Sequence, residues 1–381
     1  MSHIPATLAE ATADQTSARV ALAAALGAPS HAYLFQGPAG SGKSAAARAF
    51  AAELLAIGAP DPDSARRRAL ADPSPHPDLA WLRPPGAQHL VDEVRERIIE
   101  AAPYRPFEGS RRVFVVEEAD AMAEESQNAL LKTLEEPASF AHILLVSSQP
   151  SALLDTVRSR CQAISFAALS PEALEARLSE GHPGSNAAEL RSAARLAGGD
   201  LALASFFLSE GGRELRSHAE ALARAARAAE LDSAPWQGLL KAAEKRGVET
   251  GENVSARFDA LAAQAKDSSD SRGEQRIRKE GAEATKRATR RGRTDALDTG
   301  FALVACWLRD LAAFGDGAED VIFNADRRAE LAEDAEGLDS RRARRAAELV
   351  MDTRRRLGVN VSEELAAEAL AFRMEAVLRG T

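Results

Sequence analysis

The chain has 381 residues, 45% of them hydrophobic, which is enough for two or three domains with cores of their own. Its formal net charge of -9 argues against strong autonomous binding to nucleic acid, which normally rests on a basic surface, so any DNA contact should be shared with partners. No run of about 20 apolar residues appears and the N-terminus lacks a secretory pattern, so we expect a cytoplasmic protein without membrane contact. Cys161 and Cys306 are the only cysteines, so no zinc site is predicted.

The first half of the chain alternates short apolar runs with amphipathic segments. The runs HAYLF (31–35), VFVV (113–116) and HILLVSS (142–148) have the length of buried strands. Their alternation with helical segments is typical of a parallel sheet with crossover helices. We therefore predict an α/β domain over residues 1–167.

The rest of the chain has helical spacing. Residues 168–212 contain helix-like segments separated by GHPGS and GGD, which predicts a small helical lid. The last proline is Pro235, and the pattern beyond it predicts an all-helical domain over residues 213–381. The stretch 266–293 is heavily charged; a solvated helix face or a mobile connector is favoured over a nucleic-acid patch, because the whole chain is acidic.

A phosphate-binding (Walker A) loop follows the first apolar run. It consists of Gly37, Pro38, Ala39, Gly40, Ser41, Gly42, Lys43 and Ser44. Glycines in this pattern let backbone N–H groups converge on phosphate oxygens at the start of a helix, and the lysine adds a charge near the terminal phosphates. The loop therefore predicts binding of ATP or ADP, with Ser44 as a magnesium ligand. A glycine-rich turn that binds nothing, including a loop kept only as architecture, is the alternative.

Two carboxylates follow the second apolar run. Glu117 and Glu118 stand at the carboxyl end of a predicted strand, where ligand sites of parallel sheets lie. In such a Walker B element the first acid holds magnesium, usually through water, and the second orients the attacking water. Glutamate in place of the usual aspartate at 117 shifts the carboxylate outward and weakens the case for hydrolysis. Acidic capping of the next helix is the alternative for each residue.

These features, with Ser159-Arg160-Cys161 downstream, resemble the AAA+ ATPases of clamp loaders. Over residues from about 5 to 165 the chain is similar to bacterial DNA polymerase III clamp-loader subunits, above all to the delta-prime type. The segments that carry the similarity are HPDLAWLRPPG (76–86), VDEVRERI (91–98), RRVFVVEEADAM (111–122) and NALLKTLEEP (128–137). The ending NVSEELAAEALAFRMEAVL also looks like the last collar helix of such subunits.

The resemblance implies a hetero-oligomer that acts in DNA replication. The partners would be the gamma/tau motor subunits, the delta subunit, the sliding clamp and primed DNA, with contacts through a helical collar. Arg160 would act in trans as an arginine finger on the nucleotide of a neighbouring subunit, a surface salt bridge being the alternative. Ser148 matches the polar position that contacts the γ-phosphate or positions water, although a hydrogen-bonded hydroxyl at a strand end fits equally well.

Two departures from the clamp-loader pattern bear on catalysis and metal binding. Related subunits usually carry a four-cysteine zinc module where this chain has residues 59–75, which contain no cysteine. Leu201 stands where the lid often presents an arginine to the γ-phosphate, and a hydrophobic side chain cannot stabilise phosphate charge. We therefore expect weak ATP hydrolysis by the chain itself, or none. A gamma-type motor ATPase, favoured by intact Lys43 and Glu118, and an unrelated P-loop kinase are the alternative functions.

Overall fold

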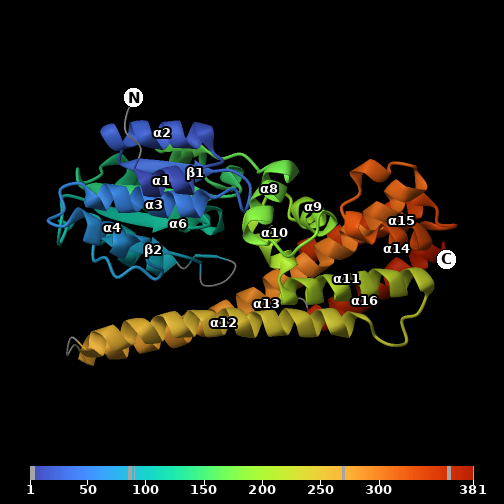
Figure 1. The fold of residues 1–381 in the computed structure, drawn as a ribbon. Helices are drawn as coiled ribbons and strands as arrows, with labels where there is room; N and C mark the ends of the chain where they lie inside the picture. The colour runs from blue at the N-terminus through green and yellow to red at the C-terminus, as the bar shows by residue number, and fades with distance from the viewer. Residues whose placement is uncertain (1–4, 85–87, 90, 268–270, 358–361, 381) are drawn as a thin grey trace. The chain divides into compact units, whose positions relative to one another are not determined.

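The computed structural model describes residues 5–84, 88–89, 91–267, 271–357 and 362–380. They form two compact units (Figure 1). The first runs to Leu169 and includes Arg257–Gln275, and the second consists of Ser170–Ala256 and the residues from Arg276 onward. None of the described helices is long and apolar enough to cross a membrane.

A five-stranded parallel sheet forms the middle of the first unit. Its strands are β1 (Ala32–Gln36), β2 (Leu79–Leu82), β3 (Arg112–Val116), β4 (Ala141–Ser147) and β5 (Gln162–Ser165). Their order across the sheet is β2-β3-β4-β1-β5, and every pairing is parallel. The three apolar runs thus become β1, β3 and β4, which confirms the predicted α/β domain.

Alternating side chains of the strands build one core on each face of the sheet. Tyr33 and Phe35 of β1 pack with Phe50 on one face, whereas Leu34 packs in the other core with Leu130. The helices of this unit are α1 (Ala6–Ala11), α2 (Thr16–Gly27), α3 (Lys43–Ala56), α4 (Pro62–Leu70), α5 (Val91–Val94, continued by a π-helical turn), α6 (Glu124–Glu135) and α7 (Asp155–Arg158). Because helices cover both faces, the carboxyl edge of the sheet is where polar loops can gather.

The HPDL segment, one of those that carry the clamp-loader resemblance, has a structural role. Asp78 is only 2% exposed, and its carboxylate accepts hydrogen bonds from the backbone N–H groups of Phe107 (2.8 Å) and Glu108 (3.0 Å). His76 accepts from the backbone N–H of Asp78 at 3.1 Å. The buried carboxylate therefore fixes the loop before β3, where Tyr104 and Phe107 are exposed.

The second unit is helical throughout its described elements. They are α8 (Pro171–Gly181), α9 (Ala187–Leu196), α10 (Leu201–Leu208), α11 (Glu210–Ala228), α12 (Trp236–Asp267), α13 (Ser271–Gly315), α14 (Arg328–Ala335), α15 (Ser340–Leu357), α16 (Glu363–Arg379) and short 3-10 turns, with the tip of the α12–α13 pair assigned to the first unit. The helical character predicted for residues 168–212 and 213–381 is confirmed. The exact boundary between a lid and a collar stays a prediction, since both stretches lie in this one unit.

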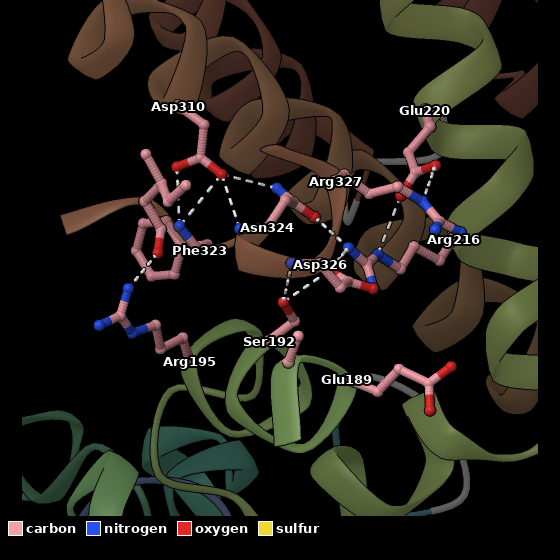
Figure 2. Close-up of polar contacts among 12 residues, drawn as sticks. Glu189, Ser192, Arg195, Arg216, Glu220, Asp310, Phe323, Asn324, Asp326 and Arg327 are labelled. Carbon is pink, nitrogen blue, oxygen red and sulfur yellow. Dashed lines mark hydrogen bonds and ion pairs between the residues drawn. The ribbon is translucent and has the colours of Figure 1, made fainter. Parts of the chain in front are cut away.

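A buried polar network joins the helices predicted as lid and collar (Figure 2). Ser192 of α9 donates to Asp326 at 2.6 Å, and Arg216 of α11 donates to both oxygens of the same carboxylate at 2.7 and 2.8 Å. Asp310 of α13, 1% exposed, accepts from the backbone and the side chain of Asn324, each at 2.8 Å. Polar groups buried this deeply require such partners, so the network ties α9 to α11 and α13.

Small residues let α12 and α13 pack closely. A Cβ atom on Gly247 would lie 2.6 Å from the carbonyl oxygen of Thr289, and one on Gly292 would lie 2.6 Å from the hydroxyl of Thr250. In the described part of the charged stretch the backbone is helical, and most of the lysines and arginines whose side chains are described are exposed, as the solvated-helix interpretation predicts. Residues 268–270 of that stretch lie outside the described residues.

Candidate functional site

The predicted phosphate loop lies between β1 and the first turn of α3, as its sequence context requires. Gly37 has φ +152°, and a Cβ atom there would lie 2.3 Å from the carbonyl oxygen of Phe166. Gly42, the residue before α3, has φ +87°, in the left-handed region that side chains disfavour. The loop thus follows a backbone path that needs glycine, and it ends at a helix N-terminus, where the first N–H groups have no partner within the helix and can bind anions.

Gln15 holds this loop in place, a role that the sequence did not reveal. Its side-chain amide donates to the backbone oxygens of Ser41 (3.1 Å) and Ala167 (2.8 Å), and its carbonyl accepts from the N–H of Ala167 at 3.0 Å. The side chain is buried, with 7% of the residue exposed. Gln15, the residue just before α2, therefore connects the loop to the segment that follows β5.

The loop lysine points back to its own loop. Lys43 is 5% exposed; its ammonium donates to the carbonyl oxygen of Pro38 and lies 3.4 Å from the Ser41 hydroxyl. The Ser41 hydroxyl donates to the same Pro38 oxygen at 2.8 Å. The ammonium is thus held inside the loop, close to where phosphate oxygens would be bound, and a bound phosphate would have to replace the carbonyl as its partner.

Strand register brings an unexpected cation to the Walker B acid. Leu82 of β2 pairs with Val116 of β3, so the next residues, Arg83 and Glu117, emerge side by side. Arg83 Nε donates to Glu117 Oε2 at 2.6 Å, and Trp81 Nε1 donates to the same oxygen at 2.8 Å. Sequence spacing alone could not indicate this pair, because the two residues follow different strands.

The two predicted magnesium ligands do meet. The Ser44 hydroxyl, in the first turn of α3, lies close enough to the Glu117 carboxylate to help lower its pKa. Burial alone would raise the pKa of Glu117, but the adjacent Arg83 guanidinium, the Ser44 hydroxyl and the hydrogen bond from Trp81 hold that pKa below its ordinary value. The carboxylate is therefore ionised and already compensated by a positive charge.

A second ion pair extends this arrangement. Arg83 reaches Asp72 at 2.9 Å, and Asp72 also lies 3.3 Å from Arg48 of α3. The Arg48 guanidinium stacks 4.0 Å from the centre of the Trp81 ring. Burial lowers the pKa of Arg48, a shift that the neighbouring Asp72 opposes. Asp72 also lies 3.3 Å from Arg257, so three guanidinium groups and two carboxylates are linked beside the loop. We call Arg48, Asp72, Trp81, Arg83 and Glu117 the Arg83 network.

This set does not fit magnesium as it stands. Ser44 and Glu117 offer the oxygen donors that the ion prefers, and its octahedral shell demands near-ideal placement. However, Glu117 Oε2 already accepts from both Arg83 and Trp81. A divalent cation at that oxygen would face the Arg83 charge directly. The magnesium site at Ser44 and Glu117 stays a prediction, and it requires Arg83 to leave. Among the described residues no group of three or more His, Cys, Asp or Glu side chains could hold a metal ion.

The other two predicted catalytic positions lie at the carboxyl edge of the sheet. Glu118 follows β3 in a left-handed conformation (φ 52°, ψ 52°), and its side chain makes no capping hydrogen bond to the next turn. Ser148 follows β4, is exposed, and donates its backbone N–H to Asp120 at 3.0 Å. The catalytic roles of Glu118 and Ser148 stay predictions.

Arg160 lies just beyond α7 and is paired within the chain. Its guanidinium donates to Glu135 at 2.5 Å and to the backbone oxygen of Thr156 at 2.9 Å. The side chain is 34% exposed, and that of Glu135 is 48% exposed. Burial raises the pKa of the neighbouring Cys161 thiol to about 12, so this thiol stays protonated. In the chain by itself Arg160 thus forms a salt bridge, which is the alternative to an arginine finger. Its role in trans stays a prediction.

Sequence comparisons agree on the first unit. Residues 13–170 match the profile of the family described as "DNA polymerase III, delta subunit". The DNA polymerase III subunit delta' of Bacillus subtilis is 36% identical over 153 residues, which are 40% of this chain and 46% of that protein. The corresponding protein of Pseudomonas aeruginosa is 43% identical over 141 residues, 34% of this chain and 41% of its own length. The chain therefore spans less than half the length of these curated relatives.

Other similar proteins carry the gamma/tau name. The DNA polymerase III subunit gamma/tau of Mycobacterium tuberculosis is 32% identical over 179 residues, 46% of this chain and 31% of that protein. A solved structure of a gamma subunit-related protein from Thermotoga maritima is 15% identical, with a TM-score of 0.43, and covers 94% of this chain and 99% of its own.

Proposed function

We infer that the chain works as a delta-prime-type subunit of the sliding-clamp loader in DNA replication, because its N-terminal region matches the DNA polymerase III delta-subunit profile and is similar to two delta' subunits. The match of residues 13–170, which contain both the phosphate loop and the SRC segment, carries this proposal. Its partners would be the gamma/tau motor subunits, the delta subunit, the clamp and primed DNA. The helical second unit would supply the collar contacts.

Nucleotide binding belongs to the same proposal. The glycine path of the loop, the N-terminus of α3 and the buried Lys43 favour ATP or ADP as the ligand. Weak or absent hydrolysis is the corollary, because Glu117 is held by Arg83 instead of being available to a metal. Replacing Lys43 with alanine should weaken nucleotide binding by removing a charge at the phosphates, which isothermal titration would measure.

The arginine finger is the third part of the proposal. Arg160 stands in the SRC segment at the end of α7, and a partly exposed side chain at such a site can be presented to another subunit. A guanidinium at a neighbour's γ-phosphate stabilises the charge of the transition state. Glu135 would hold Arg160 until the neighbouring nucleotide replaces it as the anion.

A gamma-type motor subunit is the second candidate. Gamma/tau proteins are among the relatives, and the chain keeps Lys43 and Glu118. Steady-state ATP hydrolysis by the isolated chain separates the two, since a motor subunit needs a metal-competent Walker B acid. A turnover that disappears in Lys43→Ala would favour the motor.

Co-purification tests the proposal as a whole. The tagged chain should elute in one stable complex when co-expressed with the delta and gamma/tau subunits of its own organism. The matched control is the same preparation with the untagged chain. Assembly of the other subunits without this chain, in repeated preparations where it is folded and present in excess, would contradict the proposed function.

A further inference from the structure

The charge balance of the Arg83 network differs from that of a magnesium-dependent phosphate loop. In such a loop the Walker B acid is an anion without a cationic side chain, and the metal ion compensates its charge. Here Arg83 Nε lies 2.6 Å from Glu117, whose side chain is 16% exposed. The guanidinium therefore stands where the positive charge of the metal would otherwise be needed.

We propose that Arg83 takes the place of the divalent cation at Glu117, so that this loop holds nucleotide phosphates without magnesium. The inference deepens the proposed nucleotide binding and rests on it. It also makes a separate claim about the protein alone: Glu117 is a latent metal site that Arg83 closes.

Two further contacts hold Arg83 in position. Asp72 receives two hydrogen bonds from its guanidinium, at 2.9 and 3.3 Å. Trp81, two residues earlier on the same face of the chain, donates to the same Glu117 oxygen as Arg83. A hard cation that entered would have to break the ion pair to Glu117 and would meet a guanidinium that Asp72 keeps close. Because like charges a few ångströms apart repel, binding of a divalent cation at this oxygen is disfavoured while Arg83 stays in place.

Terbium(III) reports on the latent site without any nucleotide. Terbium prefers oxygen donors as magnesium and calcium do, and its emission is sensitised by a tryptophan close to it. Trp81 is hydrogen bonded to Glu117, so an ion at that carboxylate would emit on tryptophan excitation. The unaltered chain should give no emission that depends on Glu117. Arg83→Gln should produce saturable emission, and adding Glu117→Gln to that variant should abolish it.

A matched control isolates the effect of charge. Arg97 lies in the same unit, pairs with Glu93 at 3.2 Å, and is as exposed as Arg83, 46% against 47%. Arg97→Gln removes a comparable cation from a surface ion pair and should leave the terbium emission unchanged. Circular dichroism and thermal melting of each variant establish that it is folded before the titration.

Nucleotide titration supplies the second arm. The affinity of the unaltered chain for ADP should change by less than about threefold between millimolar magnesium and EDTA, and for Arg83→Gln magnesium should strengthen binding by about tenfold or more. The inference would be overturned if the unaltered chain gave terbium emission that Glu117→Gln removes. It would also be overturned if folded Arg83→Gln gave no terbium emission. Failure to bind ADP in every condition would refute only the proposed nucleotide binding, because the terbium arm still decides whether Arg83 closes a metal site.

Discussion

Replacing Arg160 with alanine separates a role in trans from a surface salt bridge. The pair with Glu135 is solvent-accessible on both sides, 34% and 48% exposed, and such pairs contribute about 0–1 kcal/mol to stability. An arginine finger contributes about 10³ or more in rate at its site, which corresponds to about 4 kcal/mol of transition-state stabilisation. The contact with Glu135 is therefore too weak to keep Arg160 from a neighbouring nucleotide.

The variant should accordingly fold, bind its own nucleotide and enter the complex almost normally. ATP hydrolysis by the assembled loader, stimulated by clamp and primed DNA, should fall because one motor site loses its finger while the others remain. Arg158→Ala is the matched control: that residue lies two positions earlier, is 44% exposed and pairs with Asp155 at 3.0 Å. Equal stimulated rates for the Arg160 variant, the Arg158 variant and the unaltered complex would refute the reasoning.

Three further predictions concern stability and domain structure. Asp78→Ala removes two hydrogen bonds to a buried carboxylate and should lower the free energy of unfolding by about 3 kcal/mol or more, as urea denaturation would measure. Asp326→Asn should cost about 3 kcal/mol at pH 7 by leaving Arg216 short of a partner in the buried network. Burial alone would raise the pKa of Asp326, but Arg216 and Ser192 hold it below its ordinary value. Its stabilising contribution is therefore present above about pH 4 and lost as the pH falls further, so this variant should flatten that part of the stability profile. A chain ending at Leu169 should keep its near-ultraviolet circular dichroism and melt cooperatively, whereas one ending at Arg213 should bind a hydrophobic dye, because it exposes α8–α10 without their partners in the second unit.

Local patterns predicted three of the five strands, the phosphate loop and the helical character of the second half of the chain. The apolar runs became β1, β3 and β4 because buried parallel strands are nearly continuous in hydrophobic residues. The phosphate loop could be found because its glycines are required by local backbone geometry, as the positive φ of Gly37 and Gly42 shows. The proline-free region after Pro235 became long helices, since nothing in it interrupts helical hydrogen bonding.

Contacts between distant segments could not be predicted. Arg83 meets Glu117 only because β2 pairs with β3 in one register, and a shift by one residue would send both side chains elsewhere. Gln15 and Ala167 are 152 positions apart in the sequence but hydrogen bonded in the fold. This contact also depends on the tertiary structure, which a single sequence does not display. The pairing of Arg160 with Glu135 joins two segments 25 positions apart in the sequence, and no local pattern indicates it.

Reconstituted clamp loading tests the central claim most directly. The gamma/tau and delta subunits of the source organism, the clamp and primed DNA would be combined with and without this chain, and loaded clamp would be counted by its retention on circular DNA. We predict that loading requires the chain. Arg160→Ala should reduce the rate of clamp loading, whereas Arg158→Ala should load the clamp at the same rate as the unaltered protein. Clamp loading at the full rate in the absence of the chain would contradict the account.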